Sequence, residues 1–409
     1  MISTKRGLFV YAFLSSLGKA FVISTDTLYF LSKGLTFRNI SELDTVMCVT
    51  IMLLEVPTGI IADRYGRKIS LVFSVTMRGI GYALVARGAG FTAMVAAYVF
   101  FGIGSALQSG AINAWLVDAM NEKEKSKIQS AMARLSSFSQ IGNAGGALLG
   151  GFAFTASINL PWYCGLLSMV GALIVLCTTR ESFVNKPAHI NWHGNITAAT
   201  YRVRQEVRSV WDNYLSNSTL MAILLYSSVG TIALVGIFMM WQPWFVGLLG
   251  PGRKEMIGFI WMCFAIANLI ANKVVDSTHN LTDSRRLTMA SLIAGLPLIG
   301  FALAGSLWVA LPMYMIHVFG EAFKEPIVIG ILHDQANGER RATIESYHSL
   351  LTSIAEAFGF LIMGFLIDAQ GMKLVACECA AIYVIAGIFA NGLGKNSING
   401  MPRPIVEDT

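Results

Sequence analysis

The stretch Gly59-Ile-Ile-Ala-Asp63-Arg64-Tyr65-Gly66-Arg67-Lys68 lies between two apolar runs, at about 43–62 and 69–86. Its basic side chains favour the cytoplasmic side of a membrane, because cytoplasmic loops are enriched in Lys and Arg. Gly66 permits a tight turn. We expect Asp63 to end a helix and Gly59 to let helices approach closely. The stretch therefore predicts a short turn between two membrane-spanning helices.

The composition is that of a membrane protein. Of the 409 residues, 55% are hydrophobic and only 13% are charged, whereas a soluble domain has about 25% charged residues. So few charges cannot cover a water-soluble protein of this size. The six cysteines lie in apolar runs, without the spacing of metal ligands or of a disulfide framework, and we interpret them as packing residues. We expect an all-α integral membrane protein without a metal or cofactor.

Twelve apolar runs have about the 20 residues that a membrane-spanning helix needs. They lie at about 8–31, 43–62, 69–86, 91–117, 130–156 and 161–178, and at about 219–243, 256–275, 287–304, 306–332, 343–367 and 373–391. We therefore predict two six-helix bundles, at 1–179 and 219–392, separated by a cytoplasmic linker at 180–218 and followed by a cytoplasmic tail at 393–409. Such repeated halves are typical of transporters.

The basic residues predict that both ends of the chain are cytoplasmic. Of the 30 Lys and Arg, 20 fall on the side of the N-terminus, six fall on the other side and four fall within the runs. A wrong number of spans would destroy this asymmetry. In the linker, residues 201–211 alternate basic side chains with Val and Trp, which suits a helix on the cytoplasmic membrane surface. Membrane topology thus accounts for the net charge of +6, and no nucleic-acid partner is expected.

The stretch 59–68 resembles the cytoplasmic loop signature of the major facilitator superfamily, with every key position filled. The preceding Glu55-Val-Pro57-Thr resembles the same stretch in a bacterial branch of the superfamily. Arg340-Arg341-Ala-Thr-Ile-Glu-Ser346 resembles the start of the superfamily's eleventh helix. The resemblance covers essentially the whole chain. It implies a bacterial, drug/proton antiporter-like transporter in the cytoplasmic membrane that works by alternating access. It also implies that Arg67 pairs with Asp118, at the end of the fourth helix, as a gate latch.

Other family elements are weaker in this sequence. The arginine common in the fourth helix would fall near Tyr98 and is absent, and the fifth-helix glycine motif appears only as Gly142-Asn-Ala-Gly-Gly146-Ala-Leu-Leu-Gly150-Gly151, without its proline. Small residues at every fourth position equally predict close helix packing. These departures leave the direction of transport and its coupling open.

Ionisable side chains within the apolar runs are candidates for the transport pathway, because a charge in the bilayer costs at least a few kcal/mol unless it is paired or hydrated. Ser15, Lys19 and Asp26 have the spacing of one helix face, and we place the residues at 317, 321, 324 and 325 on one stripe of the tenth helix. The candidates for proton coupling are Asp26, Glu321, Glu325 and Glu356.

Burial raises the pKa of a carboxyl group and a neighbouring cation lowers it. Glu321 beside Lys324 can therefore be tuned so that substrate binding moves a proton, or the two can form an intrahelical pair that only neutralises itself. His317 is either a proton relay or a helix-contact histidine. The resemblance implies that the first and tenth helices line a central cavity.

A second group of side chains is predicted to contact the substrate or line its cavity. Gln108 and Trp115 share a face of the fourth helix, and Tyr226 lies close to one stripe with Trp241 and Trp244. Aromatic and acidic groups suit apolar or cationic guests, although the two tryptophans alternatively fit an interfacial belt. The candidates are Lys19, Gln108, Trp115, Tyr226, His317 and Lys324.

We predict proton-coupled export of a small amphipathic or cationic compound, as in multidrug efflux. Uptake of a polar metabolite such as a sugar, organic acid or siderophore, by symport or uniport, is the alternative; a non-transporting receptor or scaffold is a third class. The sequence lacks a GxxxxGK[ST] loop and an HExxH motif, so neither an ATP-driven pump nor a metalloenzyme is expected. The expected partners are a small-molecule substrate, protons and the lipid bilayer, and we expect a monomer.

Overall fold

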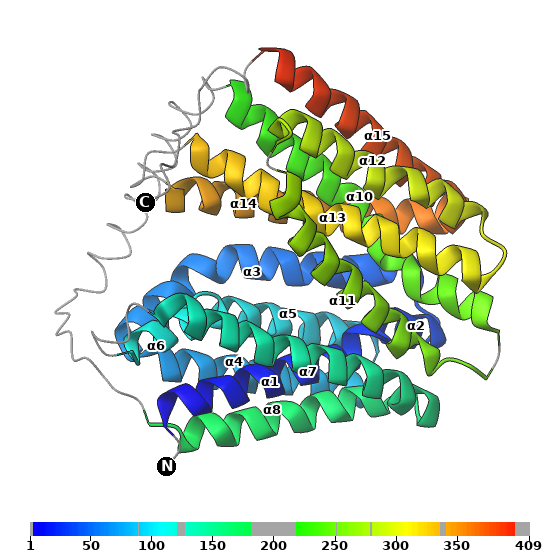
Figure 1. Ribbon diagram of the computed structural model, residues 1–409. Helices are drawn as coiled ribbons and strands as arrows, with labels where there is room; N and C mark the ends of the chain where they lie inside the picture. The colour runs from blue at the N-terminus through cyan, green and yellow to red at the C-terminus, as the bar shows by residue number, and fades with distance from the viewer. Residues whose placement is uncertain are drawn as a thin grey trace. The chain divides into compact units, whose positions relative to one another are not determined.

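The computed structural model describes residues 3–88, 90–120, 127–180, 218–250, 252–278, 280–335 and 341–396, and this part is helical without a β-strand (Figure 1). The first-half helices are α1 (Thr4–Ile23), α2 (Asp26–Ser32), α3 (Phe37–Tyr65), α4 (Arg67–Ala86), α5 (Phe91–Gln108), α6 (Ala111–Asp118), α7 (Ile128–Ala156) and α8 (Leu160–Thr178). The second-half helices are α10 (Ser218–Leu249), α11 (Met256–Val275), α12 (Asp283–Leu303), α13 (Leu307–Asp334), α14 (Arg341–Gln370) and α15 (Met372–Asn396). The all-α prediction is confirmed; the surface helix predicted at 201–211 lies outside the described residues.

Many of these helices have the length and composition of membrane spans. Within the described part, nine helical segments are long and apolar enough to cross a bilayer. Helices α3, α7 and α13 are 29, 29 and 28 residues long, which also exceeds the roughly 20 residues required. A helix satisfies its own backbone hydrogen bonds, so it can cross lipid without polar partners. The chain is a multi-pass membrane protein.

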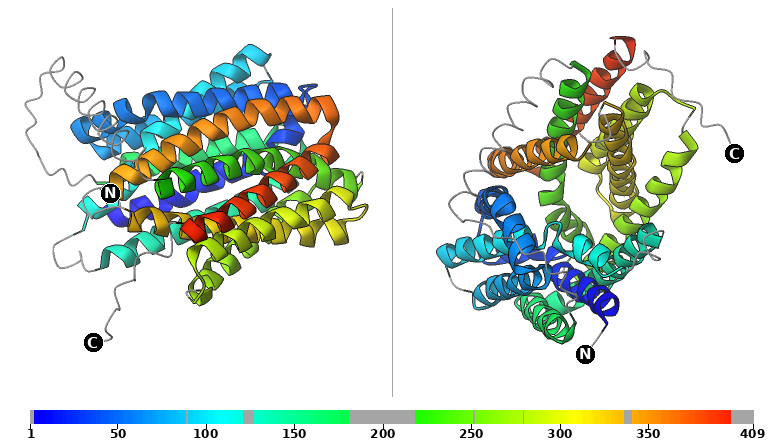
Figure 2. Two further views of the ribbon diagram at one scale, coloured as in Figure 1. Left: turned by 90° about the horizontal axis from the view of Figure 1, so that it is seen from above. Right: turned by 90° about the vertical axis from the view of Figure 1, so that its left-hand side faces the viewer.

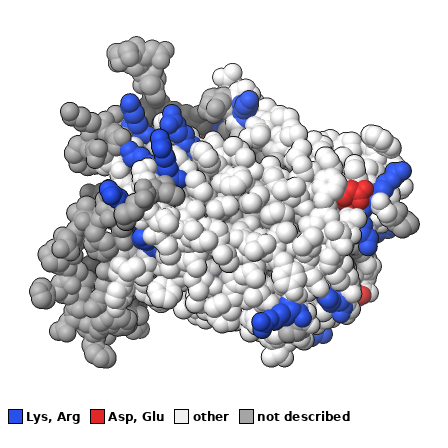
Figure 3. All heavy atoms as spheres, turned by 90° about the horizontal axis from the view of Figure 1, so that it is seen from below, with Lys and Arg blue, Asp and Glu red and all other residues white. Residues whose placement is uncertain are grey.

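The surface of the protein fits an apolar solvent. In the face shown in Figure 3, most charged side chains lie toward two ends, with a broad uncharged area between them. Large apolar side chains are exposed on the helices, among them Leu167 at 68% and Ile174 at 60% on α8. These side chains face lipid rather than water, which explains why so few charges suffice.

The first predicted span is broken into two helices. Helix α1 ends at Ile23, residues 24–25 interrupt it, and α2 begins at Asp26. The expectation that Ser15, Lys19 and Asp26 share one continuous face is therefore wrong, because the helical register restarts after the break. On α1 itself, Ser15 is buried and Lys19 is exposed.

The fourth predicted span is also broken. Helix α5 ends at Gln108 and α6 begins at Ala111, and between them Gly110 has a φ of 69°. This left-handed conformation favours glycine. Gln108 and Trp115 therefore lie on two separate helices, and their predicted common face is wrong because the register does not continue through the break.

The structure divides into two compact units that we describe separately. The first comprises Met1–Lys186, Phe238–Ala265 and Ala357–Gly371; the second comprises Pro187–Ile237, Ile266–Glu356 and Met372–Thr409. The division thus passes through α10, α11 and α14. The domain boundaries expected from the sequence, at 179 and 219, stay a prediction.

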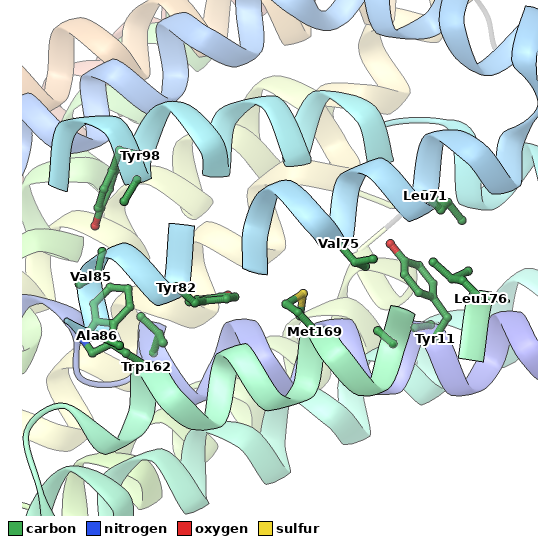
Figure 4. Packing of buried hydrophobic residues seen from close by; sticks show 14 of the residues in the cluster. Tyr11, Leu71, Val75, Tyr82, Val85, Ala86, Tyr98, Trp162, Met169 and Leu176 are labelled. Atoms are coloured by element: carbon green, nitrogen blue, oxygen red, sulfur yellow. The ribbon is translucent and has the colours of Figure 1, made fainter. Parts of the chain in front are cut away.

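In the first unit, α1 packs against α7 and α8, and α4 packs against α5 and α8; Figure 2 (right) shows this bundle nearly end-on. The predicted close packing of the α7 glycines is confirmed: a Cβ at Gly142, Gly146 or Gly150 would overlap backbone oxygens of α1. Trp162 on α8 lies 5.2 Å from Tyr29 on α2, ring centre to ring centre, and Figure 4 shows it beside Tyr82 on α4 within the apolar core. Close backbone packing thus holds α1 against α7, and the rings join α2, α4 and α8.

Segments of the second half complete the first unit at the end of α3 opposite Gly66. The Asp368 carboxylate on α14 accepts hydrogen bonds from the backbone N–H groups of Phe37 (3.1 Å) and Arg38 (2.8 Å). These two groups lie at the start of α3, where backbone N–H groups lack intrahelical partners and the helix dipole favours an anion. Asp368 therefore joins α14 to the first turn of α3.

Candidate functional site

The turn that connects α3 and α4 is built on a single glycine. Gly66, with a φ of 103°, ends α3 after Tyr65 and immediately precedes Arg67, the first residue of α4. The prediction that Asp63 ends the helix is wrong, because the helix continues until the glycine changes the backbone direction. Gly59 is not a close-contact site either: a Cβ there would meet no atom within 4 Å. The side chains of Asp63 and Arg64 lie outside the described residues.

Two cations of the same stretch bind neighbouring helices. Arg67 Nε donates to Asp118 Oδ2 at 2.8 Å, at the last residue of α6. Lys68 Nζ donates to the backbone oxygen of Thr179 at 2.7 Å, directly after α8. The Arg67 and Asp118 side chains are 27% and 48% exposed, so water weakens their attraction. The pair is present, and its role as a gate latch stays a prediction.

A buried glutamine connects the break in the first span to α10. Gln242 is completely buried. Its Nε2 donates to Asp26 Oδ1 at 2.7 Å and to the Ile23 backbone oxygen at 3.0 Å, and its Oε1 accepts from the Leu28 backbone N–H at 3.3 Å. One amide thus supplies partners for the chain on both sides of the break. Asp26, a predicted coupling residue, is part of this joint between two helices.

In the second unit, a lysine and a glutamate form a buried ion pair within α13. Lys324 Nζ donates to both carboxylate oxygens of Glu321, at 2.7 and 2.8 Å, and the two side chains are 8% and 11% exposed. The Nζ atom lies 5.7 Å from the centre of the Tyr383 ring on α15. A Cβ at Gly230 on α10 would lie only 3.0 Å from Nζ. The lysine is therefore enclosed between α10, α13 and α15.

Two further predicted residues of this unit bind α12. His317 is 1% exposed, and its Nδ1 lies 2.8 Å from the backbone oxygen of Ala294. Tyr226 is 3% exposed; its hydroxyl lies 2.7 Å from Ser291 Oγ and donates to the Leu287 backbone oxygen at 3.2 Å. Both side chains thus join their own helix to α12.

The four residues of the predicted stripe on α13 differ in burial. His317 and Lys324 are buried and Glu321 is largely buried, whereas Glu325 is exposed. Positions 317, 321, 324 and 325 of one continuous helix fall within about 100° of each other around its axis, so Glu325 lies at the exposed edge of this stripe. Glu356 lies partly buried on α14.

The predicted aromatic and amide candidates other than Tyr226 lie in the first unit, where the tryptophans are buried and Gln108 is partly buried. Trp115 is 2% exposed within the apolar core. Gln108 Oε1 accepts a hydrogen bond from the Tyr11 hydroxyl at 3.1 Å. Trp241 and Trp244 are 0% and 7% exposed, so their interpretation as an interfacial belt is wrong.

A sequence profile of the Major Facilitator Superfamily matches residues 8–344. The chain belongs to the Major Facilitator Superfamily. The resemblance carried by residues 59–68 is therefore confirmed at the level of the family, whose members are transporters rather than enzymes.

Several curated superfamily proteins are similar to this chain. YxaM of Bacillus subtilis (strain 168), described as an uncharacterized MFS-type transporter, is 23% identical over 88% of this chain and 87% of its own length. Multidrug resistance protein 2 of the same organism is 21% identical over 75% of this chain and 74% of its own. Quinolone resistance protein NorA of Staphylococcus aureus (strain MRSA252) is 22% identical over 47% of this chain and 52% of its own.

Solved structures of transporters share the fold. An inward-facing, unoccupied bacterial homologue of the human lysosomal transporter Spinster has a TM-score of 0.78 at 16% identity, covering 98% of both chains. A mutant of the nucleoside transporter NupG has a TM-score of 0.77 at 12% identity, covering 95% of this chain and 99% of that one. At such identities the likeness shows the fold and not the substrate.

Reasoning from the sequence did not identify Gln242 and Arg78 as site candidates. Gln242 and Arg78 each interrupt an apolar run, which is the signal that marks them. Their partners are not visible in the sequence: Gln242 binds Asp26, and the Arg78 guanidinium donates to Ser15 Oγ at 3.2 Å and to Ser105 Oγ at 3.4 Å. Only the fold brings these pairs together.

Proposed function

We propose that the protein is a monomeric secondary transporter of a bacterial cytoplasmic membrane, with twelve spans and both termini in the cytoplasm. It exports a small amphipathic or cationic compound in exchange for protons by alternating access. Family membership supports transport, and the names of two relatives, Multidrug resistance protein 2 and NorA, support drug-like cargo.

The observation that carries proton coupling is the buried contact of Lys324 with both oxygens of Glu321. A carboxylate in an apolar span is costly unless it is paired with a cation or protonated. Protonation of Glu321 releases Lys324, and a cationic compound competes with the proton for the same group. One carboxylate that binds either a proton or a cation is the simplest device for exchange. Asp26, Glu325 and Glu356 are the other candidates for this role.

Two contacts of the first unit are the gates of this proposal. The Arg67–Asp118 pair joins α4 to α6 beside the turn at Gly66, and the Asp26–Gln242 contact joins α2 to α10. In the proposed topology the first is cytoplasmic and the second external. A ligand or proton that breaks one contact shifts the population between conformations.

Everted membrane vesicles, acidified inside, test the proposal with ethidium as the cationic probe. Because the membrane of these vesicles is inverted, a protein that exports ethidium from the cell in exchange for protons should carry ethidium into the vesicles while protons leave them. Glu321→Gln cannot bind a proton, and we expect it to lose at least about tenfold of this flux. Glu42→Gln, which changes an exposed carboxylate paired with Arg38 on α3, is the matched control and keeps the flux.

Several outcomes contradict parts of the proposal. If Glu325→Gln abolishes coupled flux and Glu321→Gln does not, the coupling role belongs to Glu325. Proton-driven flux in the opposite direction favours uptake by symport, and flux that ignores the pH gradient favours a uniporter. If a broad panel of drugs, sugars, amino acids and siderophores shows no counterflow in proteoliposomes, the protein is not a transporter of these classes.

A further inference from the structure

Arg78 is a cation in the middle of α4 whose hydrogen-bond partners are two neutral serines. Its guanidinium donates to Ser15 Oγ on α1 at 3.2 Å and to Ser105 Oγ on α5 at 3.4 Å. Charge-assisted hydrogen bonds are shorter, at about 2.7–2.9 Å. A guanidinium has five N–H donors, so the two serines leave both its charge and most of its donors available.

The surrounding helices supply no carboxylate for this charge. Helices α1, α4, α5, α7 and α8 contain no Asp or Glu. Glu55 on α3 is exposed, and within the described part of the chain Arg78 makes no ion pair. A charge inside a span without a counter-charge is costly, and such residues mark ligand pathways.

The side chains around Arg78 form a polar group in an otherwise apolar bundle. Tyr11 precedes Ser15 by one turn of α1, and Gln108 follows Ser105 by one turn of α5. The Tyr11 hydroxyl donates to Gln108 Oε1 at 3.1 Å, which connects the two helix faces. Figure 4 shows the Tyr11 ring directed from α1 toward α4. Three hydroxyls and an amide thus accompany one guanidinium.

The packing of α4 on α5 fixes the position of the arginine. A Cβ at Gly104 would lie 2.6 Å from Arg78 Cγ and 2.8 Å from the Ser74 backbone oxygen. Ser74 Oγ donates to the Gly104 backbone oxygen at 2.5 Å. The glycine lets the stem of the arginine pass close to α5 and holds its head between α1 and α5. The arginine is half-buried.

We propose that Arg78 binds a carboxylate carried by the transported compound, with Ser15 and Ser105 orienting the guanidinium. The inference rests on the proposed transport function and places amphipathic acids and zwitterions among its cargo. A planar guanidinium binds a carboxylate through two parallel hydrogen bonds. The ligand then supplies the counter-charge that α1, α4, α5, α7 and α8 lack.

Matched acid and ester pairs test the carboxylate directly. Norfloxacin, indole-3-acetate and benzoate are each compared with their methyl esters for thermal stabilisation of the purified full-length protein, since a binder raises apparent stability. Norfloxacin belongs to the compound class in the name of NorA. We expect at least one acid to bind the wild type at least about tenfold more tightly than its ester.

The variants separate binding from folding. Arg78→Gln is expected to bind the acid about tenfold or more weakly and the ester unchanged, and Arg78→Lys is expected to recover part of the acid affinity because it keeps the charge. Arg134→Gln, which removes an exposed arginine of α7, is the matched control and keeps the preference. If Arg78→Gln does not fold, the acid preference of Arg78→Lys decides the question.

Equal binding of acid and ester by the wild type, full acid affinity in Arg78→Gln, or no stabilisation by any acid each overturns the inference. Ethidium counterflow in proteoliposomes is measured in parallel. Ethidium exchange without acid binding means that transport stands and the carboxylate site fails. If the protein shows neither acid binding nor ethidium exchange, the transport proposal fails as well.

Discussion

Replacing Gln242 with methionine should release the joint between α2 and α10. Methionine is similar in length to glutamine but makes none of its three hydrogen bonds, to Asp26, Ile23 and Leu28. A neutral hydrogen bond contributes about 1 kcal/mol and one to a charged group about 2 kcal/mol. The loss is therefore about 3–4 kcal/mol, which is a few hundredfold in an equilibrium constant.

The assay is hydrogen–deuterium exchange at residues 23–32 of the purified protein. Exchange there requires local opening, so the rate reports the free energy of that opening. Gln242→Met should accelerate it by about a hundredfold or more, and Asp26→Asn, which keeps an acceptor oxygen, by about tenfold or less. Gln108→Met is the matched control, because it removes a glutamine hydrogen bond elsewhere, to Tyr11.

A change of less than about threefold in Gln242→Met would refute the reasoning, because it would mean that water or other groups replace the lost bonds. Equal acceleration in Gln108→Met would show a general loosening of the protein instead. A double-mutant cycle of Gln242→Met and Asp26→Asn measures the coupling of the two side chains, and additive effects would contradict their direct contact.

Three further predictions concern the other contacts. Asp118→Asn breaks an exposed ion pair, so we expect no more than about a fivefold shift between conformations in spin-label distance measurements; a larger shift contradicts this weak contribution. Gly364→Ala places a Cβ against the Ser41 side chain of α3 and should lower the free energy of unfolding by about 1–3 kcal/mol. At Gly59 a Cβ has free space, so Gly59→Ala should leave the free energy of unfolding unchanged or raise it. Denaturant unfolding measures both variants. Lys324→Met leaves a carboxylate unpaired and should destabilise by about 3 kcal/mol, with much of the loss recovered when Glu321→Gln is added; an additive double variant would argue against the ion pair.

The local features of the protein could be predicted well from the sequence. Apolar runs with few charges predict helices because a chain in lipid must satisfy its backbone internally. The glycine series of α7 predicts close packing, because only small side chains let two helix backbones approach. The loop around Gly66 carries enough fixed positions to indicate both the family and the pair of Arg67 with Asp118.

Predictions that required a continuous helix failed at the breaks. Helical periodicity places Asp26 with Lys19, and Trp115 with Gln108, only while the register continues. Apolar composition does not reveal the interruption at residues 24–25. The polar groups beside this interruption are hydrogen-bonded by Gln242, which is distant in the sequence. Gly110 is a weak signal for the second break, because glycine is also common inside membrane helices.

The sequence by itself determined that the chain crosses a membrane many times, which residues carry charge within the spans, and where the turn between α3 and α4 lies. These are properties of single segments and of their solvent. The tertiary structure decided which buried polar groups meet. Gln242 meets Asp26 over a sequence separation of 216 residues, and Arg78 meets two serines instead of a carboxylate. Such pairs depend on the packing of several helices at once, and no local pattern encodes that packing.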